Sequence, residues 1–197
     1  MLEFVIENEE RARGNNVICG VDEAGRGCLC GPVYAAAVIL PENYFHPDLN
    51  DSKKLSPKKR ELLFDDIVKN AVSYGIASAS VEEIEQINIL NAAMLAMRRA
   101  VSMLDTTVDI ALVDGNIARG FECDTRTVVK GDSLSPSIAA ASILAKVSRD
   151  RYITEISPKY PKYAFEKHKG YATREHIAAI REHGPCEIHR PSFLKKI

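Results

Sequence analysis

The chain of 197 residues has no tryptophan, no long apolar run and no C-x-x-C cysteine pair, and each absence narrows its possible class. No apolar stretch approaches the roughly 18 residues that cross a bilayer, and the N-terminus lacks the basic and then apolar segments of a secretion signal. We therefore expect a cytoplasmic protein with no membrane partner. The five cysteines include no C-x-x-C pair, which favours reduced thiols over a disulfide framework or a zinc site.

The net charge of −1 conceals an uneven distribution along the chain. Residues 1–125 contain 12 basic and 20 acidic residues, whereas residues 126–197 contain 14 basic and 7 acidic residues. The near-neutral total argues against a strongly basic nucleic-acid binder, but the basic C-terminal part indicates an anionic partner.

The chain shows no internal repeat, low-complexity tract or Gly/Ser linker, and its length is typical of one domain. We expect a single domain over residues 1–197, with a basic helical region from about 158 to 197. Five apolar segments predict strands, and they cover residues 17–22, 33–40, 72–79, 109–113 and 125–129.

The spacing of these strands restricts how they pair. Only about nine residues separate the first two strands, too few for a parallel crossover, so they should pair antiparallel. The helical stretch between the third and fourth strands permits a crossover that places strands on both sides of the first. Helices are expected over 57–71, as a short and then a longer helix ending near 104, and over 136–156 and 173–183. The fold class is therefore α/β, with a mixed five-stranded sheet flanked by helices.

Four carboxylates share one position in this scheme: each lies at or just past the C-terminal end of a predicted strand. One such Asp is typical of a turn, but four together indicate a site, because sites form at the strand ends of such sheets. Clustered carboxylates raise each other's pKa unless a cation lies among them. The four residues are Asp22, Glu23, Asp114 and Asp132.

The ligand chemistry of this cluster favours a hard divalent cation, Mg²⁺ or Mn²⁺, over zinc. Two such ions roughly 3.5–4 Å apart suit in-line attack on a phosphodiester. Asp22 belongs to the most central strand, so we expect it to bridge the two ions.

The motif over residues 22–27, D-E-A-G-R-G, makes the interpretation specific, because the chain resembles the type 2 ribonucleases H and bacterial ribonuclease HII in particular. Six motifs in the family's order are a far stronger signal than one. The others are Asn50–Leu55 (NDSKKL), Asp114–Asn116 (DGN), Lys130–Ser133 with Ser137–Val147 (KGDS, SIAAASILAKV), His168–Tyr171 (HKGY) and His189–Phe193 (HRPSF).

The resemblance implies a ribonuclease H-like fold and an endonuclease that cuts RNA within RNA–DNA hybrids. It also implies incision 5′ of single ribonucleotides embedded in duplex DNA, leaving a 3′-hydroxyl and a 5′-phosphate. The family's catalytic and metal-binding carboxylates correspond to the four named above.

Further residues are expected to contact substrate. In the family, the loop of Gly25, Arg26 and Gly27 reads the ribose 2′-hydroxyl through its main chain, and Arg26 can fork onto a phosphate; a plain turn explains the Gly-Arg-Gly spacing as well. Tyr171 matches the tyrosine that stacks on the next sugar, although a half-buried core role is commoner for tyrosine. The remaining candidates are Asn50 and the phosphate contacts Lys53, Lys54 and Lys146, with His168 and His189 assigned to structure or phosphate contact.

The chain departs from the family at Cys28-Leu29-Cys30, where Pro and then small or apolar residues are usual, so a looser ribose-reading loop is expected. The chain stops soon after Phe193, and an archaeal-style clamp-binding tail is therefore not expected. A monomer is the expected state.

Several alternatives remain open. A ribonuclease HIII would carry an N-terminal substrate-binding domain, for which the first strand leaves no room. Junction resolvases and integrase-type transferases of the same superfamily lack the 22–27 loop. A non-catalytic nucleic-acid binding module would have no need for clustered carboxylates, which repel the phosphate backbone unless a metal lies among them. A small-molecule phosphohydrolase would need a closed pocket and no basic C-terminal part.

Overall fold

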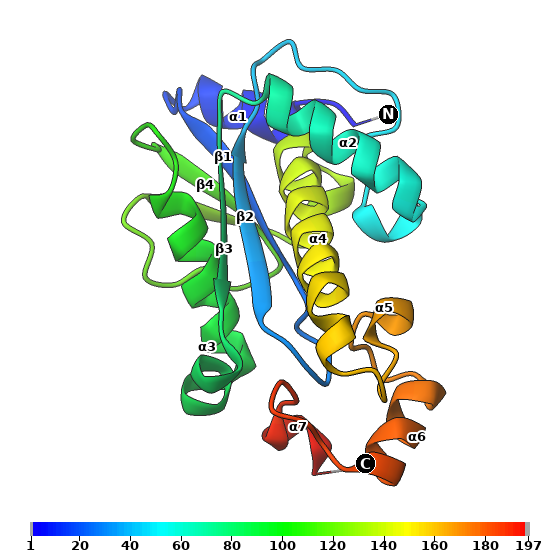
Figure 1. Cartoon of the computed structure of the whole chain (residues 1–197). Coiled ribbons are helices and arrows are strands. Elements are labelled where there is room, and N and C mark those ends of the chain that lie inside the picture. Colours follow the sequence, from blue (N-terminus) through cyan, green and yellow to red (C-terminus); the bar gives the residue numbers. More distant parts are fainter. Residues whose placement is uncertain (1, 196–197) are drawn as a thin grey trace.

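The computed structural model describes residues 2–195, which form a mixed sheet in the order β3-β2-β1-β4-β5 (Figure 1). β1 pairs antiparallel with β2, and β2 with β3, whereas β4 lies parallel to β1 and to β5. The predicted mixed sheet and antiparallel first pair are thus confirmed. The strands are β1 (Ile18–Ala24), β2 (Val33–Ile39), β3 (Ser73–Ala79), β4 (Ile110–Asp114) and β5 (Asp124–Val128).

The longer helices begin where the sequence predicts. Ser56, Ser80 and Ser135 each cap a helix by accepting a hydrogen bond from the backbone amide three residues on. The α-helices are α1 (Val5–Ala12), α2 (Pro57–Asn70), α3 (Val81–Ser102), α4 (Pro136–Ile156), α5 (Phe165–His168), α6 (Arg174–His183) and α7 (Pro191–Leu194); the 3₁₀ turns are η1 (Ser52–Lys54), η2 (Gly131–Ser133) and η3 (Ser157–Lys159).

A kink divides α3 into the expected short and longer parts. Asn88 adopts a left-handed φ of 65° inside the helix. Its side-chain oxygen accepts hydrogen bonds from the amides of Leu90 and Asn91, at 3.0 and 3.1 Å. Asn88 therefore acts as an internal N-cap for the second part.

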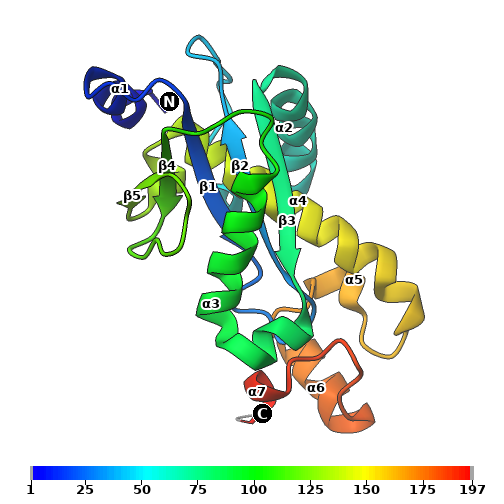
Figure 2. The same cartoon turned by 90° about the vertical axis from the view of Figure 1, so that its left-hand side faces the viewer.

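Helices cover both faces of the sheet (Figures 1 and 2): α4 and α2 lie on one face and α3 on the other. The N-terminal end of α4 lies directly on β1, because a Cβ at Gly20 would come within 2.1 Å of the Ser137 carbonyl carbon. This close approach requires glycine at position 20. It anchors α4 over the strand that carries Asp22 and Glu23.

The helix α1 was missed by the sequence analysis. Its buried Glu7 accepts hydrogen bonds from the Ser135 hydroxyl at 2.6 Å and the Ser137 amide at 3.2 Å. A carboxylate at the N-terminus of α4 also interacts favourably with the helix dipole. The contacts of Glu7 that attach α1 to the rest of the fold are therefore made with residues distant in the sequence. The local pattern of apolar residues does not reveal them.

The C-terminal segments gather beyond the end of α4, on the side where β1 turns into β2 (Figure 1), and the predicted helical C-terminal part is confirmed. A separate apolar cluster around Ile153, Tyr163 and Phe165 holds them together. Among residues 2–195, no helix is both long and apolar enough to cross a membrane.

Three histidines lie inside this C-terminal cluster. The His168 and His176 rings stack at 4.4 Å, and the Nε2 atoms of His176 and His189 lie 3.0 Å apart. His189 Nδ1 also contacts the Cys186 sulfur at 3.1 Å. Burial, with smaller contributions from the neighbouring rings, lowers the pKa of His176 to about 4 and also lowers the pKa of His189. His176 is therefore neutral near pH 7 and packs as part of the structure.

We predict that this cluster weakens the fold in mild acid. Between a pKa of 6.5 in the unfolded chain and about 4 in the folded chain, only the unfolded state takes up the His176 proton, so stability falls as pH falls. For His176 alone the loss at pH 5 is roughly 2 kcal/mol. Urea unfolding gives the free energy of unfolding of the wild type and of His176→Gln at pH 7.5 and at pH 5. The wild type should lose more stability than the variant between these two pH values. The same difference between wild type and His176→Gln at both pH values would contradict the assignment.

Candidate active site

The parallel pairing of β1 with β4 brings two distant carboxylates together. Val21 is aligned with Val113, so the next residues, Asp22 and Asp114, lie side by side on neighbouring strands. The Asp22 side chain is buried, and the Asp114 carboxylate accepts a hydrogen bond from the Gly131 amide at 2.7 Å. That bond ties the turn before Asp132 to the end of β4.

The strand β1 continues to Ala24, so Asp22 and Glu23 lie two residues and one residue before its end and not beyond it. The Glu23 side chain is therefore positioned by the strand itself. Its carboxylate accepts a hydrogen bond from Arg26 at 3.0 Å, and the Arg26 side chain is about half exposed. Arg26 therefore faces the carboxylate cluster and remains accessible to a further anion.

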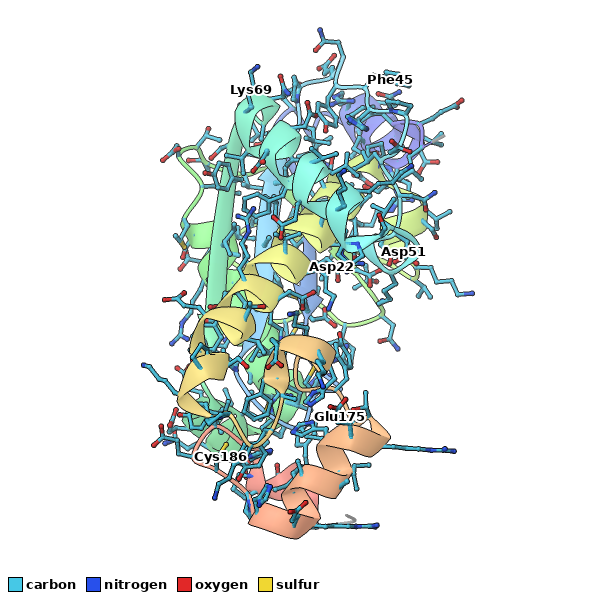
Figure 3. The ribbon with its side chains drawn as sticks, turned by 45° about the vertical axis from the view of Figure 1, so that its right-hand side comes forward. Asp22, Phe45, Asp51, Lys69, Glu175 and Cys186 are labelled. Carbon is cyan, nitrogen blue, oxygen red and sulfur yellow. The ribbon has the colours of Figure 1, made fainter. Side chains whose placement is uncertain are left out.

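Asp132 reaches the same place from η2, and it brings a fifth carboxylate with it. Asp132 is buried, lies 4.0 Å from the Lys53 ammonium and forms a side-chain hydrogen bond with Asp51. Figure 3 shows Asp22 and Asp51 on the same flank of α4. Asn50 and Lys53 were expected at the site from this motif, whereas Asp51, which stands between them, was not.

The carboxylates raise one another's pKa. Burial raises the pKa of Asp22 well above its ordinary value, and the charges of Glu23, Asp114 and Asp132 raise it further. Burial also raises the pKa of Glu23 against the opposing effect of Arg26, and that of Asp132 with help from Asp51 and Asp114. A bound cation would relieve this repulsion.

The four carboxylates lie near one another, but their present orientations do not form a metal-binding site. Within residues 2–195, no three His, Cys, Asp or Glu side chains are arranged to hold a metal ion as they stand. Asp22 accepts from the Glu23 amide at 2.6 Å, and Glu23 and Asp114 also bond protein donors. The set offers only oxygen donors, which fits Mg²⁺ or Mn²⁺, provided that the carboxylates reorient on binding.

The two glycines of the adjoining loop have different roles. Gly25 has a φ of +99°, and a Cβ there would lie 2.1 Å from Arg149 Nε, so the fold itself requires glycine. Gly27 has an ordinary φ and nothing within 4 Å of an added Cβ. No described part of the chain explains glycine at position 27, and the open space beside it leaves the backbone accessible.

Two buried arginines hold this loop. Arg149 donates to the carbonyls of Pro32, Cys30 and Lys169, at 2.9–3.2 Å. Arg190 donates to the carbonyls of Gly31, Arg26 and Cys28, at 2.8–3.1 Å. The loop with Cys28-Leu29-Cys30 is therefore firmly anchored, in contrast to the looser loop that the missing Pro suggested.

Tyr171 stands next to the same loop. The Leu29 amide donates to the Gly170 carbonyl at 2.8 Å, which joins the two segments. The Lys146 ammonium lies 5.0 Å from the centre of the Tyr171 ring and donates to Asp150 at 2.8 Å. Burial lowers the pKa of Lys146.

The remaining candidate substrate contacts lie in different parts of the surface. Lys146, Lys167 and Lys169 line one groove together with Tyr171, whereas Arg174 lies in a separate hollow on α6. Asn50 accepts a hydrogen bond from the Asp51 amide at 2.9 Å, which shapes the turn that carries Asp51. His168 and His189 are both buried, which favours the structural role over phosphate contact for each. The side chain of Lys54 lies outside the part of the chain that the structure describes.

The fold and these motifs define a hydrolase of the ribonuclease H type. The solved ribonuclease H2 of Pyrococcus horikoshii matches 90% of this chain and 93% of its own with a TM-score of 0.73 at 25% identity. Bst-RNase HIII in complex with Mn²⁺ matches 86% of this chain and 63% of its own with a TM-score of 0.65 at 16% identity, a likeness of fold alone.

Within this class the sequence comparisons are decisive. Residues 19–196 match the family described as Ribonuclease HII. A ribonuclease HII of Caldicellulosiruptor bescii is 55% identical over 194 residues, covering 98% of this chain and 94% of the relative. The chain belongs to the ribonuclease HII family. It is therefore a ribonuclease H hydrolase, and the family match favours this assignment over ribonuclease HIII or a non-catalytic binding module.

We predict that alanine at the two loop glycines affects different properties, stability at Gly25 and substrate binding at Gly27. Gly25→Ala should destabilise the fold by about 1–2 kcal/mol from the left-handed backbone alone, with displacement of Arg149 in addition. Gly27→Ala should leave the midpoint of thermal unfolding unchanged, because its Cβ meets nothing, and should weaken binding of ribonucleotide-containing duplex. Thermal unfolding and anisotropy titrations of both variants measure the two effects. Equal loss of stability in both would show that the loop geometry differs from that described.

Proposed function

We propose that the chain is an endoribonuclease that hydrolyses the RNA strand of RNA–DNA hybrids and incises 5′ of single ribonucleotides embedded in duplex DNA. The products carry a 3′-hydroxyl and a 5′-phosphate. The observation that carries the proposal is the convergence of Asp22, Glu23, Asp114 and Asp132 beside the anchored loop of residues 25–27.

The four carboxylates would hold two divalent ions, Mg²⁺ or Mn²⁺. Such ions activate an attacking water and stabilise the leaving oxygen of a phosphodiester. Asp22 is central because it lies on the inner strand β1 and interacts electrostatically with the other three. The charge of Asp51 raises the pKa of Asp132, and a cation held by Asp132 would offset that repulsion.

The neighbouring groups would hold the substrate strand. Gly27 leaves the main chain open to the ribose, Gly25 sets the turn, and the accessible guanidinium of Arg26 can fork onto a phosphate. Lys53 is largely exposed next to Asp132 and would contact a phosphate close to the reacting one. Tyr171 is 38% exposed and would stack on the sugar after the ribonucleotide, with Lys146 behind it.

Other parts of the proposal concern the whole chain. We infer that residues 1–197 act as one catalytic domain whose basic helical region, from about 158 to 197, contributes to substrate binding, and that it works as a monomer. Asn50 acts by shaping the turn before Asp51 and Lys53.

The decisive test is cleavage of a DNA duplex that contains one ribonucleotide. We expect Mg²⁺- or Mn²⁺-dependent incision 5′ of the ribose, abolished by EDTA, with the product ends identified by ligation and phosphatase treatment. An all-DNA duplex of the same sequence is the control. Equal cleavage of that control would refute the proposed specificity.

We predict that Asp22→Asn abolishes cleavage without unfolding the protein. The neutral amide removes a buried charge whose pKa is raised by its neighbours, so in EDTA the thermal midpoint should equal or exceed that of the wild type. Asp65→Asn, at a largely exposed carboxylate of α2, is the matched control and should cut normally. Substantial cleavage by Asp22→Asn would exclude Asp22 from the metal site.

A further inference from the structure

The buried histidines connect two backbone segments by a chain of hydrogen bonds. The Cys186 amide and His189 Nδ1 lie 2.9 Å apart, and the Nε2 atoms of His189 and His176 lie 3.0 Å apart. His176 Nδ1 in turn lies 2.9 Å from the carbonyl oxygen of Tyr171, the residue that would stack on the substrate. Both histidines are buried, so these contacts take the place of water at the ring nitrogens.

The two ends of the chain determine where each proton lies. A backbone amide can only donate a hydrogen bond and a backbone carbonyl can only accept one. His189 Nδ1 lies closer to the Cys186 amide than to the Cys186 carbonyl, at 2.9 against 3.3 Å, so it is the acceptor. At the other end, His176 Nδ1 must donate to Tyr171. Because a neutral imidazole carries one proton, His189 Nε2 is protonated, His176 Nε2 is not, and the central bond runs from His189 to His176.

The chain ends on the main chain from which the Tyr171 ring projects. The Tyr171 carbonyl also accepts from the Thr173 amide at 2.8 Å, and the Tyr171 amide donates to the His168 carbonyl at 3.0 Å. The His168 ring takes part as well, because its Nδ1 accepts from the Gly170 amide at 3.2 Å. Imidazole nitrogens therefore hold the backbone on both sides of the Tyr171 Cα atom, which sets the direction of the Cα–Cβ bond.

The ring itself is less closely restrained than its backbone. Tyr171 is partly exposed, and its ring centre lies 5.0 Å from Lys146 Nζ and 5.9 Å from Arg149 Cζ. Cation–ring attraction draws a ring face toward the cations, but it does not fix where the phenol end points. The orientation of the ring therefore depends on the backbone that carries it.

We propose that His176 is a positioning residue, which holds the Tyr171 main chain so that the ring faces the sugar next to the ribonucleotide. In this arrangement His189 keeps the His176 proton on Nδ1, where the Tyr171 carbonyl needs it. The inference rests on the proposed function, since it concerns the orientation of a substrate-stacking ring.

The opposing interpretation is that His176 only stabilises the C-terminal cluster, in which it stacks on the His168 ring at 4.4 Å. The two interpretations differ in their dependence on the Tyr171 ring. If His176 acts through that ring, its removal lowers activity only while the ring is present. If His176 acts by general stabilisation, its removal lowers activity equally with or without the ring.

The proton arrangement is tested in the wild type without substrate. Long-range ¹H–¹⁵N spectra of protein labelled at histidine distinguish a protonated ring nitrogen from a bare one, and His176→Asn identifies the signals of residue 176 by their loss. At pH 7.5 we expect the proton on Nδ1 of His176 and on Nε2 of His189. A proton on Nε2 of His176 would overturn the proposal, and this test stands even if other variants do not fold.

A double-mutant cycle with Tyr171→Ala tests the positioning role. His176→Phe keeps a ring and removes both nitrogens, whereas the amide of His176→Asn retains a donor in the place of Nδ1. Both are made with and without Tyr171→Ala. Tyr44→Phe, which loses a hydrogen bond of 2.8 Å to Asp66 at the loop between β2 and α2, is the matched control. Each variant is measured for urea unfolding, for kcat/KM on the single-ribonucleotide duplex and, in EDTA, for binding of that duplex by anisotropy.

We expect His176→Phe to lower binding and kcat/KM about threefold to tenfold, the effect of one hydrogen bond. Tyr171→Ala should lose at least as much, and His176→Phe should add nothing to it, although the loss of stability should be equal in both backgrounds. His176→Asn should recover most of the activity, and Tyr44→Phe should lose stability alone.

Equal losses of binding in both backgrounds, or no loss in His176→Phe, would overturn the proposal. The spectra and the binding in EDTA do not depend on cleavage, so these outcomes are distinct from failure of the proposed function, which would appear as a wild type that does not incise the ribonucleotide.

Discussion

Two buried guanidinium groups organise the region around the candidate site. Arg149 on α4 and Arg190 just before α7 are fully buried, and neither forms an ion pair within residues 2–195. Burying a charge is costly unless hydrogen bonds replace its hydration. Here main-chain carbonyls of the β1–β2 loop accept from both guanidinium groups, although no group within residues 2–195 accepts from the buried Arg190 Nη2. Burial lowers the pKa of Arg190 to about 10, so the group stays charged near pH 7. The loop carbonyls and the arginines therefore depend on each other: displacing either leaves the other unsatisfied.

This dependence joins two parts of the chain that are distant in sequence. The loop after β1 carries Gly25–Gly27, and the segment before α6 carries Tyr171; Arg149 contacts both, through the Cys30 and Lys169 carbonyls. A glycine-rich loop is flexible in isolation, but one held at successive carbonyls is preorganised. The candidate ribose-reading loop and the candidate stacking ring are consequently held as one surface beside the carboxylates.

The charge distribution has a matching physical cause. Buried acids on β1, β4 and η2 repel one another, and the nearby cations Arg26 and Lys53 offset only part of that repulsion. Several of the basic residues beyond 125 lie beside Tyr171, in the groove that contains Lys146, Lys167 and Lys169. A polyanion bound across both regions would need cations at the acidic end, which accords with a metal-dependent reaction on nucleic acid.

The sequence by itself determined the strands, the serine caps, the pairing of β1 with β2 and the four strand-end carboxylates, because each rests on local periodicity, spacing or a contiguous motif. It did not reveal α1, whose Glu7 acts on Ser135 across 128 residues, nor Asp51, whose importance lies in its contact with Asp132. Nor did it distinguish Gly25 from Gly27, since only the position of Arg149 shows which glycine the fold requires. Tertiary structure alone decided these points, because each depends on which side chain from a distant segment occupies the adjoining space.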